Sequence, residues 1–130
     1  MAKNIGIDLG TTNSCISFIE GGVPEIIPNP EGSRVIPSIV SVSREKKPIF
    51  GNIAKRQFIS EPKNTIWGVK RIIGRKFDSP EIEKIKSIAG YGIVEAENGD
   101  AQIEFNGKTC TPEEISAMFL RYLRGIAEDY

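Results

Sequence analysis

The sequence contains no histidine, and this absence excludes several kinds of catalytic site. Without an imidazole there is no Ser-His-Asp triad and no histidine general base, and most transition-metal sites lose their commonest ligand. Any chemistry must therefore use carboxylates, lysine, hydroxyl groups or the backbone. Only two cysteines are present, Cys15 and Cys110, and they lack C-x-x-C spacing. We expect buried, reduced thiols rather than a zinc site or a disulfide.

Long hydrophobic runs are also absent, since none approaches the stretch of about 18 residues that a membrane span requires. The N-terminus passes from Met1 to Asn4 straight into a strand-like segment, without the apolar stretch of a signal peptide. We therefore expect a cytoplasmic protein with no membrane contact. A length of 130 residues suits one compact domain with a real core.

Net charge is zero, but the charges are unevenly distributed. Residues 44–77 hold ten Lys/Arg against two acids, whereas residues 78–130 hold five against eleven. A basic segment of this kind could meet nucleic acid or a smaller polyanion such as a nucleotide, although it is more often a solvated face. Few aromatic residues interleave with the charges, so we expect no nucleic-acid partner.

The first third of the chain has the pattern of a β-meander. Apolar and polar residues alternate as in half-buried strands, and Gly21-Gly22 can supply the positive φ angles of a tight hairpin. A loop rich in proline and glycine follows, and then another extended segment. The predicted strands span residues 4–9, 14–20, 23–27 and 35–43, with the loop at 28–34.

The rest of the chain alternates between helices and a second meander. Helical patterns begin at Asn52, at Asn64 or Thr65 ending near Gly74, and at Pro80 with Ser79 as the cap. Residues 91–110 predict a small meander with type I′ turns at Asn98-Gly99 and Asn106-Gly107. The last helix begins with a capping box at Thr111-Pro112-Glu113-Glu114.

That last helix carries a wide apolar stripe, and the sequence shows no strand after it. The stripe follows helical spacing and consists of Ile115, Met118, Phe119, Tyr122, Leu123 and Ile126. Because the sequence stops at Tyr130, we expect the chain to end partway through a fold and to leave the stripe uncovered. Exposed apolar surface of this size usually finds a partner, which predicts self-association or swapping through helix 112–128.

The turn GIDLGTTNSC, residues 6–15, contains the first candidate site. Gly10 lets the backbone approach a ligand closely, and Thr11, Thr12 and Asn13 surround it with polar groups and backbone N–H donors. Asp8 would repel a bare phosphate, so its presence favours Mg²⁺ with coordinated water between carboxylate and phosphate. The alternative is a plain hairpin turn, in which Gly10 and Asn13 satisfy the backbone and Asp8 merely ends a strand. The local stretch leaves both open, and neither a GxxxxGK[ST] loop nor a GxGxxG fingerprint is present.

Lys70 is the second candidate. On a helix from Thr65 to Ile73 it would share a face with Ile66, Trp67 and Ile73, which would direct the amine towards the interior or a cleft. The alternative is a lysine whose stem covers apolar surface while its amine stays in water. Arg71 and Arg75 would lie on another side of this helix, solvated or paired with acids.

Four segments together identify a resemblance: IGIDLGTTNSC, EGSRVIPSIV, GNIAKRQF and NTIWGVKRIIGRKF. In this order they resemble the bacterial DnaK branch of the seventy-kilodalton heat-shock chaperones, and the likeness covers essentially the whole chain. The Gly-x-Asp-x-Gly-Thr motif alone would also admit the wider actin-like and sugar-kinase superfamily, whereas the lysine segment favours the chaperones.

The resemblance implies an α/β protein with a partial actin-like (ribonuclease H-like) ATPase fold. Residues 1–37 and 112–130 would belong to its first core subdomain, as a β-meander with a returning helix. Residues 38–111 would form the smaller α+β subdomain beside it. The basic segment would then lie near the upper nucleotide cleft and the surface for the exchange factor.

The resemblance also implies roles for individual residues. Residues 10–13 would bind the β- and γ-phosphates of ATP or ADP, Asp8 would help to place Mg²⁺ (through water) and K⁺, and Lys70 would be the catalytic lysine. Expected partners are a J-domain co-chaperone, a GrpE-type nucleotide-exchange factor and unfolded polypeptides, the last through regions beyond this sequence.

The family's second phosphate motif, connecting motifs, adenosine motif, opposite lobe and peptide-binding domain would all follow Tyr130. The leading hypothesis is therefore an N-terminal segment of an ATP-driven chaperone, by itself unable to hydrolyse ATP usefully or to bind unfolded peptide. A second hypothesis is a non-catalytic module that binds the exchange factor or a co-chaperone. A third, a sugar-kinase-type phosphotransferase, has no support beyond the shared Asp-x-Gly-Thr.

Overall fold

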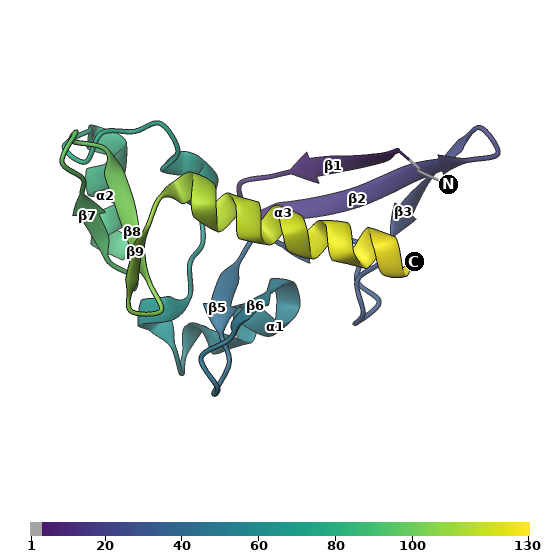
Figure 1. The fold of residues 1–130 in the computed structure, drawn as a ribbon, viewed down its shortest axis with the longest axis horizontal. Coiled ribbons are helices and arrows are strands. Elements are labelled where there is room, and N and C mark those ends of the chain that lie inside the picture. The colour runs from purple at the N-terminus through teal and green to yellow at the C-terminus, as the bar shows by residue number, and fades with distance from the viewer. Residues whose placement is uncertain (1–3) are drawn as a thin grey trace.

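The computed structural model describes residues 4–130 and opens with the predicted meander (Figure 1). Strands β1 (Ile5–Leu9), β2 (Asn13–Glu20) and β3 (Val23–Ile27) pair antiparallel in sequence order. Gly21 and Gly22 both have positive φ angles, 61° and 79°, as the two-residue hairpin requires. A short strand, β4 (Ile36–Pro37), pairs with Asn13 and Ser14 at the start of β2 and completes a four-stranded sheet.

One face of this sheet is apolar, and its middle is covered, whereas Ile5 and Ile7 on the edge strand β1 remain 38% and 36% exposed. The register places Ile7, Ile16 and Ile27 side by side, and Ile16 and Ile27 are almost fully buried. Asp8 and Ser17 alternate onto the opposite face, where Asp8 is exposed. The sheet therefore buries the middle of one face against the core and leaves Asp8 exposed on the other face.

The predicted extended segment and short helix are both present, with a hairpin that the sequence did not predict. Strand β5 (Val40–Val42) pairs with β6 (Pro48–Phe50), which leads into α1 (Gly51–Lys55) and a 3-10 turn at Arg56–Phe58. Gly51, with φ of 69°, lies so close to neighbouring side chains that an added Cβ would be 3.0 Å from a methyl of Ile36. This close approach lets α1 pack directly on the end of the first sheet.

The predicted helix from residue 64 or 65 to 74 is wrong. Ile66 instead pairs with Val40 as an isolated β-bridge, Gly68 adopts a left-handed conformation, and only 3-10 turns occur, at Pro62–Asn64 and Val69–Arg71. The two N–H···O bonds between Val40 and Ile66 measure 3.0 and 2.7 Å. Pairing with a distant strand satisfies the backbone here, so the apolar residues are buried without helical periodicity.

Helix α2 (Pro80–Ile88) begins where predicted, with Ile82 and Ile85 buried. Ser79 precedes it in an extended conformation, but its side chain makes no capping hydrogen bond, contrary to the prediction. Arg75 approaches Glu81 at 3.7 Å, in line with the expected pairing of that arginine with an acid.

The second meander consists of β7 (Ile93–Glu95), β8 (Ala101–Phe105) and β9 (Lys108–Cys110), all antiparallel. Asn106 and Gly107 both have positive φ angles, as the predicted type I′ turn requires. The Asn98-Gly99 turn is different, because only Gly99 has a positive φ and its N–H bonds to the carbonyl of Ala96. A type I′ turn requires a positive φ at both central residues, and Asn98 lacks it, so the predicted I′ turn is wrong there.

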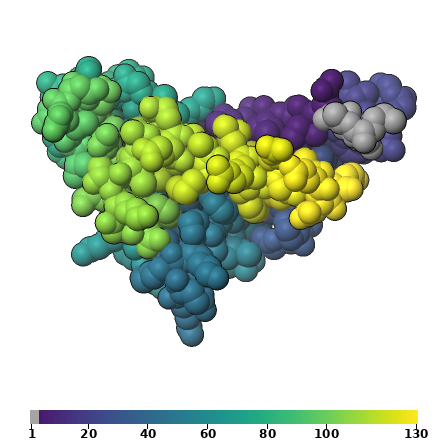
Figure 2. Space-filling model, in the orientation of Figure 1, coloured from purple at the N-terminus to yellow at the C-terminus, as the bar shows by residue number. Residues whose placement is uncertain are grey.

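Helix α3 (Pro112–Asp129) crosses the molecule from the second meander to the first sheet and forms a continuous ridge in Figure 2. The predicted capping box is present: Thr111 accepts from the N–H of Glu114 at 3.1 Å, and the Glu114 carboxylate accepts from the N–H of Thr111 at 3.0 Å.

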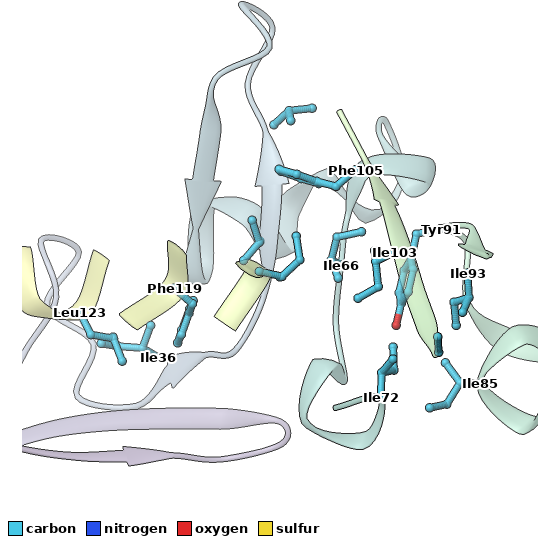
Figure 3. Close-up of a cluster of buried hydrophobic side chains, with 14 of the residues drawn as sticks. Ile36, Ile66, Ile72, Ile85, Tyr91, Ile93, Ile103, Phe105, Phe119 and Leu123 are labelled. Atoms are coloured by element: carbon cyan, nitrogen blue, oxygen red, sulfur yellow. The ribbon is translucent and has the colours of Figure 1, made fainter. Parts of the chain in front are cut away.

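The expectation of an uncovered stripe on this helix is wrong. Ile115, Phe119 and Leu123 are at most 3% exposed, Ile126 is 8% exposed, and all four belong to one buried cluster with Ile36 of β4 (Figure 3). Phe50 of β6 stacks on Tyr122 with ring centroids 4.9 Å apart. Because the first sheet and the β5–β6 hairpin cover the stripe, the reason for expecting self-association through it no longer holds.

Cys15 and Cys110 are free thiols, as expected, but both are half-buried rather than buried. Burial raises the pKa of Cys110, and the charge of Glu114 adds to the effect, so this thiol has little thiolate character. In residues 4–130, no helix is both long enough and apolar enough to cross a membrane.

Candidate functional site

The turn at Gly10–Asn13 joins β1 to β2 so tightly that residue 10 must be glycine. Leu9 and Ser14 pair across the two strands, and the backbone between them folds back on itself. A Cβ atom at residue 10 would overlap the carbonyl oxygen of Asn13. Gly10 is thus required because of a close approach between two parts of the backbone.

Ser38 holds this turn in place, and sequence reasoning missed it. Its hydroxyl donates to the carbonyl of Gly10 at 2.9 Å, and its N–H donates to the carbonyl of Thr12 at 2.9 Å. Because that hydroxyl proton is already used, the nearly buried Ser14 must donate to Ser38 Oγ across their 2.7 Å contact. Only the pairing of β4 with β2 brings Ser38 here, so no local signal could have identified it.

Two backbone donors of the turn have no acceptor among residues 4–130. Within the described part of the chain, the backbone N–H groups of Thr11 and Thr12 donate no hydrogen bond. Ser38 bonds the carbonyl groups of Gly10 and Thr12, so hydrogen bonds within the protein hold the turn. Successive free N–H groups on a fixed turn form the kind of concavity that binds anions.

Lys70 lies beside this turn, although it does not stand on the predicted helix. Its Nζ donates to the carbonyl of Leu9 at 2.9 Å, across 61 residues of sequence. The 3-10 turn at Val69–Arg71 directs it there, not the face of a helix. In residues 4–130 no carboxylate lies within salt-bridge distance of Lys70, so its charge remains available to an anion.

A small cavity separates the turn from α3. It measures about 30 Å³ and is lined by the turn, Lys70 and the first two turns of α3. That volume holds roughly one water molecule and is too small for a phosphate group. An anion that used the free donors would therefore bind on the solvent side of the turn.

Asp8 lies in β1, two residues before the turn. It is exposed on the sheet face opposite Ile7 and lies across from Cys15 in the β1–β2 ladder. Among residues 4–130, no group of three or more acidic or cysteine side chains is placed to hold a metal ion. A cation at Asp8 would consequently need most of its ligands from water or from a bound phosphate, which is how Mg²⁺ is commonly held.

A comparison with protein-family models bears on these features. The model described as Hsp70 protein matches residues 4–130 of this chain. The match includes the turn at residues 10–13, Ser38 and Lys70, and it extends through α3. The chain therefore belongs to the Hsp70 protein family.

Proposed function

We propose that this chain provides one wall of the nucleotide site of an ATP-driven chaperone. The Hsp70 family comprises chaperones that bind nucleotide, and the chain matches its model over residues 4–130. The observation that carries the proposal is that two backbone N–H groups without an acceptor in residues 4–130, those of Thr11 and Thr12, lie near the amine of Lys70, which joins no salt bridge in the same residues. These groups suit the β- and γ-phosphates of ATP or ADP.

The proposal assigns a role to each residue of the turn. Gly10 allows the close backbone approach, Thr11, Thr12 and Asn13 offer donors, and Lys70 is the catalytic lysine that stabilises charge on the γ-phosphate while water attacks. Such transfers gain mainly from positioning and charge stabilisation, so fixed donors and one lysine are suitable tools. Asp8 would hold Mg²⁺ through water and would help to place K⁺, and the metal would neutralise phosphate charge.

We assign the chain to the bacterial DnaK type, with a cytoplasmic location, and its fold to the actin-like ATPases. Residues 1–37 and 112–130 would form one subdomain, supported by the packing of α3 on the first sheet, and residues 38–111 the other. J-domain co-chaperones and unfolded polypeptides are the partners that this assignment implies for the whole protein.

Replacement of Lys70 by alanine is expected to weaken binding of Mg-ATP about tenfold, which is the change in Kd expected when one charge-assisted hydrogen bond is lost. Isothermal titration calorimetry with and without EDTA measures this change and the metal requirement. The matched control is Lys63→Ala, because Lys63 is exposed in the same basic segment and, within residues 4–130, joins no salt bridge. Equal losses in the two variants, or no binding by the unsubstituted chain at millimolar Mg-ATP, would contradict the proposal.

A second candidate function is suggested by an open hollow between β4 and α1. It measures about 510 Å³ and is lined by Asn13, Val35, Pro37, Asn52, Lys55 and Arg56. Neither Lys55 nor Arg56 forms a salt bridge within residues 4–130. Two unpaired cations beside apolar Val35 and Pro37 suit an acidic protein surface, and a GrpE-type exchange factor is the proposed partner.

Reversal of both charges, Lys55→Glu with Arg56→Glu, is expected to weaken binding of the exchange factor more than tenfold. Surface plasmon resonance without nucleotide measures this interaction. Lys84→Glu is the control, since Lys84 is exposed on α2 and joins no salt bridge in the described residues. The docking proposal fails if the double variant binds as tightly as the control.

A further inference from the structure

Lys70 stands on a turn with little regular structure of its own. Gly68 precedes it with φ of 67° and ψ of 23°, and a single 3-10 turn follows, closed by the 3.0 Å bond from the N–H of Arg71 to the carbonyl of Gly68. A glycine at this position leaves the backbone free to rotate unless neighbouring groups are fixed. The position of the Lys70 amine therefore depends on what restrains the chain on either side of Gly68.

The chain is restrained both before and after this turn. Ile66 is fully buried and pairs with Val40 in both directions, and Ile72 is fully buried after the turn. Between them, the carbonyl groups of Gly68 and Val69 accept hydrogen bonds from the turn itself and the residues just after it, whereas the carbonyl group of Trp67 is bonded to another part of the fold. That carbonyl accepts a 2.6 Å hydrogen bond from Tyr91 Oη.

Tyr91 comes from a different part of the fold, just before β7. It is 4% exposed, its ring meets the Trp67 indole edge to face at 6.0 Å, and Figure 3 shows it in the buried cluster near Ile72, Ile93 and Ile103. Burial strongly raises the pKa of Tyr91. The phenol consequently stays protonated around neutral pH and remains a hydrogen-bond donor there.

We infer that Tyr91 is a positioning residue: its hydroxyl fixes the Trp67 carbonyl and so directs the Gly68–Lys70 turn, which brings Lys70 Nζ to the carbonyl of Leu9. This inference rests on the proposed role of Lys70 in binding phosphate. It deepens that role, because it places one determinant of the lysine's position just before the second meander, in a different part of the fold from the turn at residues 10–13. Sequence reasoning gave Tyr91 no function.

The test is Tyr91→Phe, which removes the hydroxyl and keeps the ring against Trp67. Trace acetylation of lysines, read by mass spectrometry without nucleotide, compares the reactivity of Lys70 with that of exposed Lys63 in the same sample. We expect Lys70 to react about three- to fivefold faster in the variant, as for the loss of one ordinary hydrogen bond. Lys63 should not change, so a general loss of stability would not reproduce this pattern.

Tyr122→Phe is the matched control, because Tyr122 is a half-buried tyrosine that stacks on Phe50, in a different part of the core. It should leave Lys70 reactivity unchanged. Trp67 is the only tryptophan, so its emission reports whether the indole keeps its environment in each variant. A folded Tyr91→Phe variant with unchanged Lys70 reactivity would overturn the inference.

Binding of Mg-ATP to the same variants is measured separately from Lys70 labelling. Faster Lys70 labelling together with weaker Mg-ATP binding supports both the inference and the proposed function. Faster labelling in a chain that binds no Mg-ATP supports the positioning role of Tyr91 and contradicts the phosphate-binding role of Lys70. Unchanged labelling contradicts the positioning role whatever the nucleotide result.

Discussion

Replacement of Gly10 by alanine is expected to abolish measurable binding of Mg-ATP and to lower the free energy of unfolding by about 1–3 kcal/mol. The added Cβ would overlap the carbonyl oxygen of Asn13, so the turn must open. It cannot open without breaking the hydrogen bonds that Ser38 makes to Gly10 and Thr12. Calorimetric titration measures the first effect, and urea unfolding followed by circular dichroism measures the second.

Gly125→Ala provides the contrast. Gly125 lies within α3, and nothing stands within 4 Å of the position that its Cβ would occupy. Alanine there should raise the free energy of unfolding by about 0.5–1 kcal/mol, because it favours the helix, and should leave nucleotide binding unchanged. A Gly10→Ala variant that binds Mg-ATP normally would show that the close turn is not part of a phosphate site.

Truncation of Leu123 to alanine is expected to destabilise the protein by about 3 kcal/mol. Leu123 is fully buried in the cluster that joins α3 to the first sheet, so its removal leaves a cavity as well as losing apolar burial (Figure 3). Chemical denaturation measures the change in the midpoint and in the free energy of unfolding. Arg121→Ala, on the exposed side of the same helix, should stay within about 0.5 kcal/mol of the unsubstituted chain.

This experiment also separates the two views of the α3 stripe. If the stripe were uncovered, as its sequence pattern predicted, Leu123→Ala would cost little stability and would reduce any self-association seen by light scattering. If the stripe is buried, Leu123→Ala lowers the free energy of unfolding and does not change self-association. The second result is expected from the exposures of Ile115, Phe119 and Leu123.

Local signals explain which elements the sequence could predict. The β1–β3 meander follows from alternation and from Gly21-Gly22, and α3 follows from its capping box. Both depend on residues close together in the chain. The failed helix at 64–74 had apolar residues at helical spacing, but the backbone of Ile66 is paired with Val40, which lies 26 residues earlier. A long-range strand pair overrode the local pattern.

The same distinction applies to the candidate site. Gly10, Thr11 and Lys70 could be proposed from their own motifs, although the argument that put Lys70 on a helical face was wrong. Ser38 and Tyr91 act through single hydrogen bonds to carbonyl groups in other elements. A serine after a proline and a tyrosine before a strand are unremarkable in sequence, so only the assembled fold identifies these two supports.

The hydrogen bond from Lys70 to Leu9 has a consequence for how the site forms during folding. Its two partners are 61 residues apart. Their meeting also depends on β4 beside β2, on the pairing of Val40 with Ile66, and on Tyr91 beside Trp67. Contacts between such distant segments bear a large loop-closure cost and form late. A chain in which any of these elements is unfolded has no lysine beside the turn at residues 10–13. A nucleotide that binds both, as we propose, would therefore select the completed native state and stabilise it by mass action.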